Sequence, residues 1–107
     1  MKGFDFLKQA QGMQDRLKGV QEEFSNLEVA GESGAGLVKI TINGKYESLN
    51  IHIDQSLMEE SKEVLEDLIS SAFNNAVHKL EKAQKDKMSK MASTLGLPFD
   101  SFFSNER

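Results

Sequence analysis

The strongest constraint on the fold is the pair Asn43-Gly44, which separates two stretches of alternating apolar and polar residues. This arrangement predicts a β-hairpin, because a type I′ turn requires positive φ at both central residues. A two-residue turn would place Ile42 opposite Lys45 and Ile40 opposite Glu47. One face of the hairpin is then aliphatic, with Val38, Ile40, Ile42, Leu49, Ile51 and Ile53. The other face is polar, with Lys39, Thr41, Tyr46, Ser48, Asn50 and His52.

The aliphatic face needs a cover, because an isolated two-stranded hairpin is at best marginally stable in water. The preceding segment offers an apolar stripe with alternating spacings of four and three residues: Phe6, Ala10, Met13, Leu17, Val20, Phe24 and Leu27. This spacing is typical of a helix with a coiled-coil-like seam. We expect a helix over roughly Phe4 to Asn26, with its seam in the core or in a dimer contact. A charge at Leu17 is expected to destabilise the fold or the dimer.

The segment after the hairpin predicts a longer helix. Asp54 is a candidate N-cap for a short helical turn, and Ser61 is a candidate N-cap for the long helix. Apolar positions from Val64 to Leu80 form a face wide enough to cover a sheet. A helix over Ser61 to Met91, ending near Ser93, would be about 46 Å long. The strands would be about 20 Å long, so the C-terminal end of the helix must extend past the sheet.

The residues between the first helix and the hairpin leave one structural alternative open. Leu27 to Ser33 alternates and could add a first strand, which would make the sheet three-stranded and antiparallel. The glycines that follow, from Gly31 to Gly36, lead into a strand and lack the Gly-Lys-Ser/Thr ending of a phosphate-binding loop, which favours a plain turn. We expect one α+β domain over residues 1–95. Residues 96–107 are expected to form a tail that is irregular or mobile, or that folds back as a strap.

Composition excludes several classes of protein. The chain has 107 residues, of which 38% are hydrophobic and 28% charged, and it contains no cysteine. Disulfides, thiol catalysis and cysteine-based metal sites are therefore excluded. The sequence has no apolar stretch of membrane-spanning length and no signal-peptide core at its N-terminus. We expect a cytoplasmic protein without a membrane partner.

The net charge of −4 hides an uneven distribution. Residues 2–18 carry four bases and two acids, and residues 78–92 carry five lysines and two acids. Acids concentrate between these segments, at residues 22–32 and 54–67. The chain is therefore basic towards its two ends and acidic in the middle.

No constellation of residues indicates catalysis. His52 lies on the polar face of a predicted strand, and His78 lies beside the apolar stripe of the last helix. Neither has metal-ligand spacing with other residues. Glu63, Glu66 and Asp67 are better explained by favourable interaction with the positive end of a helix than by acid–base chemistry. We expect no enzyme activity, no cofactor, no metal and no small-molecule substrate.

The charge pattern suggests a nucleic-acid surface. If the first and last helices pack antiparallel, the start of one and the end of the other lie together beyond the sheet. Lys79, Lys82, Lys87 and Lys90 fall in one band of the last helix, with Lys85 to its side. Such lysines can contact phosphates without reading bases. The alternative is a solvated helix face with ordinary pairs such as Asp86 with Lys90.

Four linked motifs resemble the YbaB/EbfC family of bacterial nucleoid-associated proteins. They are Lys8-Gln9-Ala10-Gln11-Gly12-Met13-Gln14, Gly31-Glu32-Ser33-Gly34-Ala35-Gly36-Leu37-Val38-Lys39, Ile53-Asp54-Gln55-Ser56-Leu57 and Leu65-Glu66-Asp67-Leu68-Ile69-Ser70-Ser71-Ala72-Phe73-Asn74-Asn75-Ala76. The resemblance covers nearly the whole chain in order. It implies a two-layer α-β-β-β-α subunit and a tweezer-like homodimer with long projecting helices. It also implies binding to double-stranded DNA with low sequence specificity, in the nucleoid.

The resemblance maps DNA contact onto the two projecting helices by position. On the first helix the candidates are Lys8, Gln9 and Arg16, and on the last they are Lys79, Lys82, Lys85, Lys87 and Lys90. Many members end in a Pro-Pro-Gly-Phe type of tail. This chain instead has Leu97-Pro98-Phe99-Asp100, so no function carries over to its tail. Gln55 stands where proline is common. The alternative function is a protein-interaction adaptor whose helical prongs clasp another protein.

Overall fold

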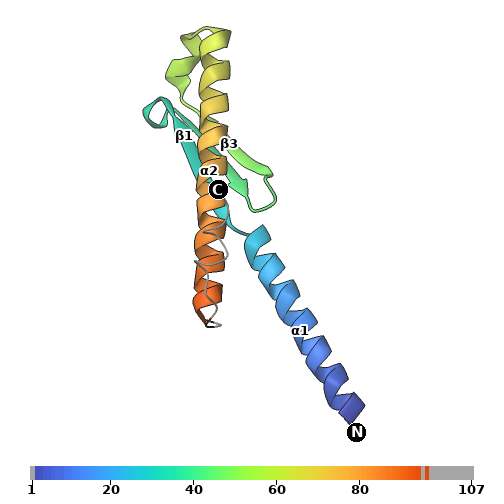
Figure 1. The fold of residues 1–107 in the computed structure, drawn as a ribbon. Helices are drawn as coiled ribbons and strands as arrows, with labels where there is room; N and C mark the ends of the chain where they lie inside the picture. The colour runs from blue at the N-terminus through green and yellow to red at the C-terminus, as the bar shows by residue number, and fades with distance from the viewer. Residues whose placement is uncertain (1, 95, 97–107) are drawn as a thin grey trace.

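The computed structural model describes residues 2–94 and Gly96 (Figure 1). In chain order the elements are α1 (Lys2–Ser25), β1 (Glu28–Ser33), η1 (Gly34–Gly36), β2 (Val38–Asn43), β3 (Ser48–Ile53), η2 (Gln55–Glu59) and α2 (Lys62–Thr94). The predicted α-β-β-β-α order is confirmed, including the optional first strand. The predicted tail lies outside the described residues, apart from Gly96.

The strands form one antiparallel sheet in the order β1-β2-β3, and α2 packs on one face of it. The core lies between α2 and β2, where Val38, Ile40 and Ile42 are buried against Ala72, Ala76 and Leu80. Gly31 in β1 allows this close packing, because a Cβ added there would lie 2.2 Å from the Ala72 carbonyl oxygen and the Ala76 nitrogen. Helix α2 therefore lies directly against the backbone of β1.

The predicted hairpin turn is wrong in detail. β2 and β3 pair Val38 with Ile53 and Ile40 with Ile51, with a register irregularity next to Ile42. Asn43 organises the longer loop, because its side-chain oxygen accepts hydrogen bonds from the backbone nitrogens of Lys45 at 2.9 Å and Glu47 at 3.1 Å. The partner of Ile40 moves by four residues, from the predicted Glu47 to Ile51. This is an even number, so the aliphatic face predicted for the hairpin is preserved.

Gly44 serves a different purpose from the predicted one. It does not adopt positive φ, whereas Tyr46 does, at 62°. The Gly44 nitrogen donates to the Ser25 carbonyl at 3.1 Å. A Cβ at this position would lie 1.7 Å from the Phe24 carbonyl oxygen. The glycine is thus required for the contact between the hairpin and the end of α1.

Both predicted caps are present. The Asp54 carboxylate accepts hydrogen bonds from the Ser56 hydroxyl at 2.6 Å and the Ser56 backbone nitrogen at 3.0 Å. These bonds, with the hydroxyl bond contributing most, lower the pKa of Asp54 from its ordinary value of 3.8. The Ser61 hydroxyl accepts from the Val64 nitrogen at 3.2 Å, at the start of α2.

The cover predicted for the hairpin is incomplete. Helix α2 packs on β1 and β2 but makes little contact with β3. As a result, Leu49 is 49% exposed and Ile51 is 51% exposed. The prediction that these two side chains are buried is therefore wrong for the single chain.

Helix α1 leads away from the sheet and has little contact with the rest of the chain (Figure 1). Its apolar seam is exposed: Phe6 by 71%, Met13 by 65% and Leu17 by 62%. The radius of gyration is 20.0 Å, whereas a compact chain of this length has about 13 Å. Most of the seam is therefore left out of the core of this chain, and only Leu27, just beyond the end of α1, packs against it.

Candidate nucleic-acid interface

The two basic segments extend from the same end of the sheet. Figure 1 shows α1 running up to the sheet and the C-terminal part of α2 running past it, with the two helices diverging. They are connected near the sheet by an ion pair between Lys87 and Glu23, at 3.6 Å. The expected common direction is therefore present, but the two helix ends spread apart and do not pack together.

On α1 the candidate residues are open to solvent. Lys8, Gln9 and Arg16 are all exposed. The side chains of Lys8 and Arg16 form no ion pair or hydrogen bond with any residue that the structure describes. Their charges are therefore available to a polyanion.

On α2 most candidate lysines are already engaged. Lys82 pairs with Asp86 at 3.2 Å, one turn along the helix. Lys87 is only partly exposed and carries the ion pair to α1. Lys85 and Lys90 are exposed residues in the C-terminal half of α2. The expected pair of Asp86 with Lys90 is replaced by the pair of Asp86 with Lys82.

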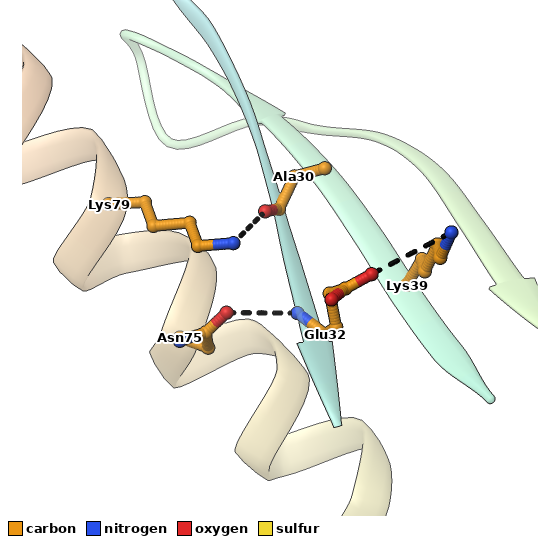
Figure 2. Close-up of polar contacts among 5 residues, drawn as sticks. All are labelled: Ala30, Glu32, Lys39, Asn75 and Lys79. Carbon is orange, nitrogen blue, oxygen red and sulfur yellow. Dashed lines mark hydrogen bonds and ion pairs between the residues drawn. The ribbon is translucent and has the colours of Figure 1, made fainter. Parts of the chain in front are cut away.

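Lys79 has a structural partner that the sequence did not indicate. Figure 2 shows its ammonium group donating to the Ala30 carbonyl, at 3.1 Å. One turn earlier, the Asn75 side-chain oxygen accepts from the Glu32 backbone nitrogen, at 3.0 Å. β1 is an edge strand, and an open edge can pair with another strand. Lys79 and Asn75 therefore each bond one backbone group on the outer edge of β1.

The sequence predicts only part of this contact between α2 and β1. Asn75 and Lys79 are four residues apart, so a helix places them on one face. Nothing in the spacing shows that this face meets the free carbonyl and amide groups of β1. That pairing depends on how α2 crosses the sheet, which is a tertiary property.

His52 and His78 lie on different elements, β3 and α2. Among residues 2–94 and Gly96, no group of three histidine, cysteine or acidic side chains could hold a metal ion. None of the helices described is long and apolar enough to cross a membrane.

Comparison with known proteins relates this geometry to a family. The sequence model of the YbaB/EbfC DNA-binding family matches residues 1–95. Among solved structures, the chain is similar to the uncharacterized protein HP0035 from Helicobacter pylori, with 27% sequence identity and a TM-score of 0.63. That match covers 78% of this chain and 89% of the other. With the family match spanning both helices and the sheet, the chain belongs to the YbaB/EbfC DNA-binding family.

Proposed function

We propose that the protein is a homodimeric, nucleoid-associated DNA-binding protein of the cytoplasm. It contacts double-stranded DNA mainly through phosphates, with low sequence specificity, and so modulates nucleoid organisation and gene expression. The observation that carries the proposal is the separation of charge along the molecule. Bases lie on the two helix ends that extend past the sheet, whereas acids gather around η2 and the start of α2 at the opposite end. A chain with net charge −4 thereby presents a cationic end to DNA.

The proposed contact residues are Lys8, Gln9, Arg16, Lys79, Lys82, Lys85, Lys87 and Lys90. The bases Lys8, Arg16 and Lys90 contribute most, since none of them has an acidic partner among the described residues. Lys82 and Lys87 would exchange a carboxylate for a phosphate. Lys79 contributes least, because its ammonium group is bonded to Ala30 beside the sheet.

The homodimer is supported by the exposed seam of α1. Its apolar side chains follow the 3–4 spacing of helices that pack against other helices. Large apolar side chains arranged on one stripe are costly to leave in water. A second copy that covers this stripe would account for a helix that its own chain leaves bare.

The test is fluorescence anisotropy of a short labelled duplex, titrated with protein at several salt concentrations. The triple variant K8A/R16A/K90A is compared with K39A/K45A/K62A, which removes three exposed bases away from the projecting ends. For the first variant we expect the slope of log K against log salt to flatten by roughly 0.9 for each phosphate that the protein no longer neutralises. For the second we expect a slope close to that of the wild type.

Each result has a clear meaning. Equal effects of the two variants would show that binding depends on overall charge and would contradict the proposed surface. A dimer that does not bind DNA even at low salt would contradict the proposed function. It would favour the protein-interaction adaptor.

A further inference from the structure

Helix α1 is attached to the rest of the chain mainly at its C-terminal end. Its last residue, Ser25, accepts a hydrogen bond from the Gly44 nitrogen at 3.1 Å. Two residues further along, Leu27 packs against the core. The remainder of α1 has little contact with the sheet or with α2. A helix attached near one end can pivot about that end, so its direction depends on whatever else holds it there.

An ion pair between α1 and α2 provides a second attachment. The Lys87 ammonium group lies 3.6 Å from the carboxylate of Glu23, which is two residues before the end of α1. The Lys87 side chain is 30% exposed, whereas that of Glu23 is 60% exposed. The lysine therefore lies against the protein and the carboxylate is open to solvent. Together with the bond at Ser25, this ion pair fixes the direction in which α1 leaves the sheet.

The position of the ion pair close to the pivot makes its effect on the far end of α1 large. From Glu23 to Lys8 the helix spans about 22 Å, so a small rotation at Glu23 becomes a large displacement at Lys8. The bases on α1 and those on the C-terminal half of α2 have the same sign and repel each other. The attraction between Glu23 and Lys87 opposes this repulsion and holds the two helices at the angle seen in Figure 1.

DNA would compete with Glu23 for the Lys87 ammonium group. Duplex DNA carries one phosphate charge for about every 1.7 Å of its length. An exposed ion pair shifts an equilibrium only about 1.5- to 5-fold, so a phosphate can displace the carboxylate. Once Lys87 has turned to a phosphate, Glu23 is left close to charges of its own sign, which repel it. Loss of the ion pair and release of α1 therefore occur together.

We propose that the ion pair of Glu23 with Lys87 is a latch, which fixes the angle between α1 and α2 in the free protein and which a DNA phosphate opens by taking Lys87 from Glu23. Glu23 is then a positioning residue that restrains the binding surface and makes no contact with DNA itself. This inference rests on the DNA binding of the proposed function and adds a means of regulating that surface.

The first test measures the angle in the free protein. The natural chain has no cysteine, so Q11C and S93C together place one spin label at an exposed position on each helix. Labelled chains are diluted with an excess of unlabelled chains, so that the distance measured by double electron–electron resonance lies within one subunit. We expect E23Q to broaden the distance distribution and lengthen its mean. The matched control E22Q, whose exposed side chain is not part of the latch, should keep the original distribution.

The second test repeats the distance measurement on the complex with a duplex of about 30 base pairs. The latch is open in the complex, so the labelled protein with and without E23Q should give the same distribution once saturated with DNA. A difference that persists in the complex would show that the ion pair stays closed on DNA and would overturn the proposal.

The third test is a thermodynamic cycle of DNA affinities, because an effect of DNA on the latch requires an equal effect of the latch on DNA binding. E23Q and E22Q each remove one negative charge from adjacent positions of α1, so they share any effect of overall charge. E23Q alone also removes the cost of opening the latch. We expect it to bind about 1.5- to 5-fold more tightly than E22Q at the same salt concentration. With K87M, which keeps the length of the side chain and removes its charge, the two substitutions should have equal effects.

The outcomes distinguish this inference from the proposed function. Equal affinities of E23Q and E22Q, or equal distance distributions of these two variants in the free protein, would overturn the latch and leave DNA binding in place. If neither the wild type nor any variant binds the duplex at low salt, the proposed function and the exchange of Glu23 for phosphate both fail. The distances in the free protein then decide whether the ion pair still sets the angle of α1.

Discussion

Glycine is required at positions 31 and 44 because another part of the backbone lies close to each of them, and not because either residue adopts a positive φ. Each lies where another backbone approaches, α2 at Gly31 and the end of α1 at Gly44. The positive φ that the Asn-Gly pair predicts for Gly44 occurs two residues later, at Tyr46. The Asn43 side chain bonds the loop nitrogens in place of a tight turn. The dipeptide therefore indicated a reversal of the chain but not its geometry.

Adding one methyl group at Gly31 should separate α2 from the sheet. In G31A the new Cβ would meet backbone atoms of Ala72 and Ala76 at 2.2 Å. Backbone cannot rotate away as a side chain can, so we expect a loss of about 1–3 kcal/mol in the free energy of unfolding. Urea denaturation followed by circular dichroism measures it.

The matched control is Gly12, in the exposed interior of α1, where nothing lies within 4 Å of an added Cβ. G12A should leave stability unchanged or raise it by about 0.5–1 kcal/mol, because alanine favours helix. An equal response at the two positions would contradict the close packing at Gly31.

At the scale of elements, the two helices differ in how they pack within the chain. Helix α2 covers β1 and β2 and bonds two backbone groups on the edge of β1, whereas α1 makes little contact within the chain. The sequence predicts both helices through their 3–4 spacing. Spacing alone did not distinguish a stripe that packs on its own sheet from one that packs on another chain. The exposure of Leu17 shows that the stripe of α1 does not pack on its own sheet.

The variant L17D tests the role of α1. Leu17 is 62% exposed in the single chain, so a charge there should not unfold the subunit. It should weaken association, because a carboxylate buried at a helix contact is costly. Sedimentation velocity should show at least a tenfold rise in the dimer dissociation constant, about 1.4 kcal/mol.

The control for this change is Q11D, at an exposed position of α1 away from the seam. It should retain the wild-type dissociation constant. A dimer unaffected by L17D would show that the seam of α1 lies outside the contact between copies.

At the scale of the whole molecule, the charges and the apolar surfaces are segregated. Bases outnumber acids on the two helix ends beyond the sheet, acids predominate around η2 and the start of α2 at the other end, and an apolar hollow lined by Ile51 and Phe73 lies beside the sheet. Salt screens the attraction between bases and phosphates, but it does not weaken apolar burial. The two proposed activities should therefore respond to salt in different ways.

Raising the salt from 50 to 200 mM should reduce DNA affinity steeply, by a factor on the order of 10³ if about six phosphates are contacted. The dimer mass should stay constant over the same range. Anisotropy and light scattering on the same samples measure both quantities. Parallel loss of mass and DNA binding would show that ion pairs hold the dimer together.

The sequence by itself determined the elements, their order, both helix caps and the segregation of charge. Each of these follows from local spacing or local side-chain chemistry. Only the tertiary structure decided the register of the hairpin, the exposure of β3 and the partners of Lys79 and Lys87. These depend on how α2 crosses the sheet and on where α1 leaves it. Local spacing does not encode such crossings, because they arise from packing between residues far apart in the chain.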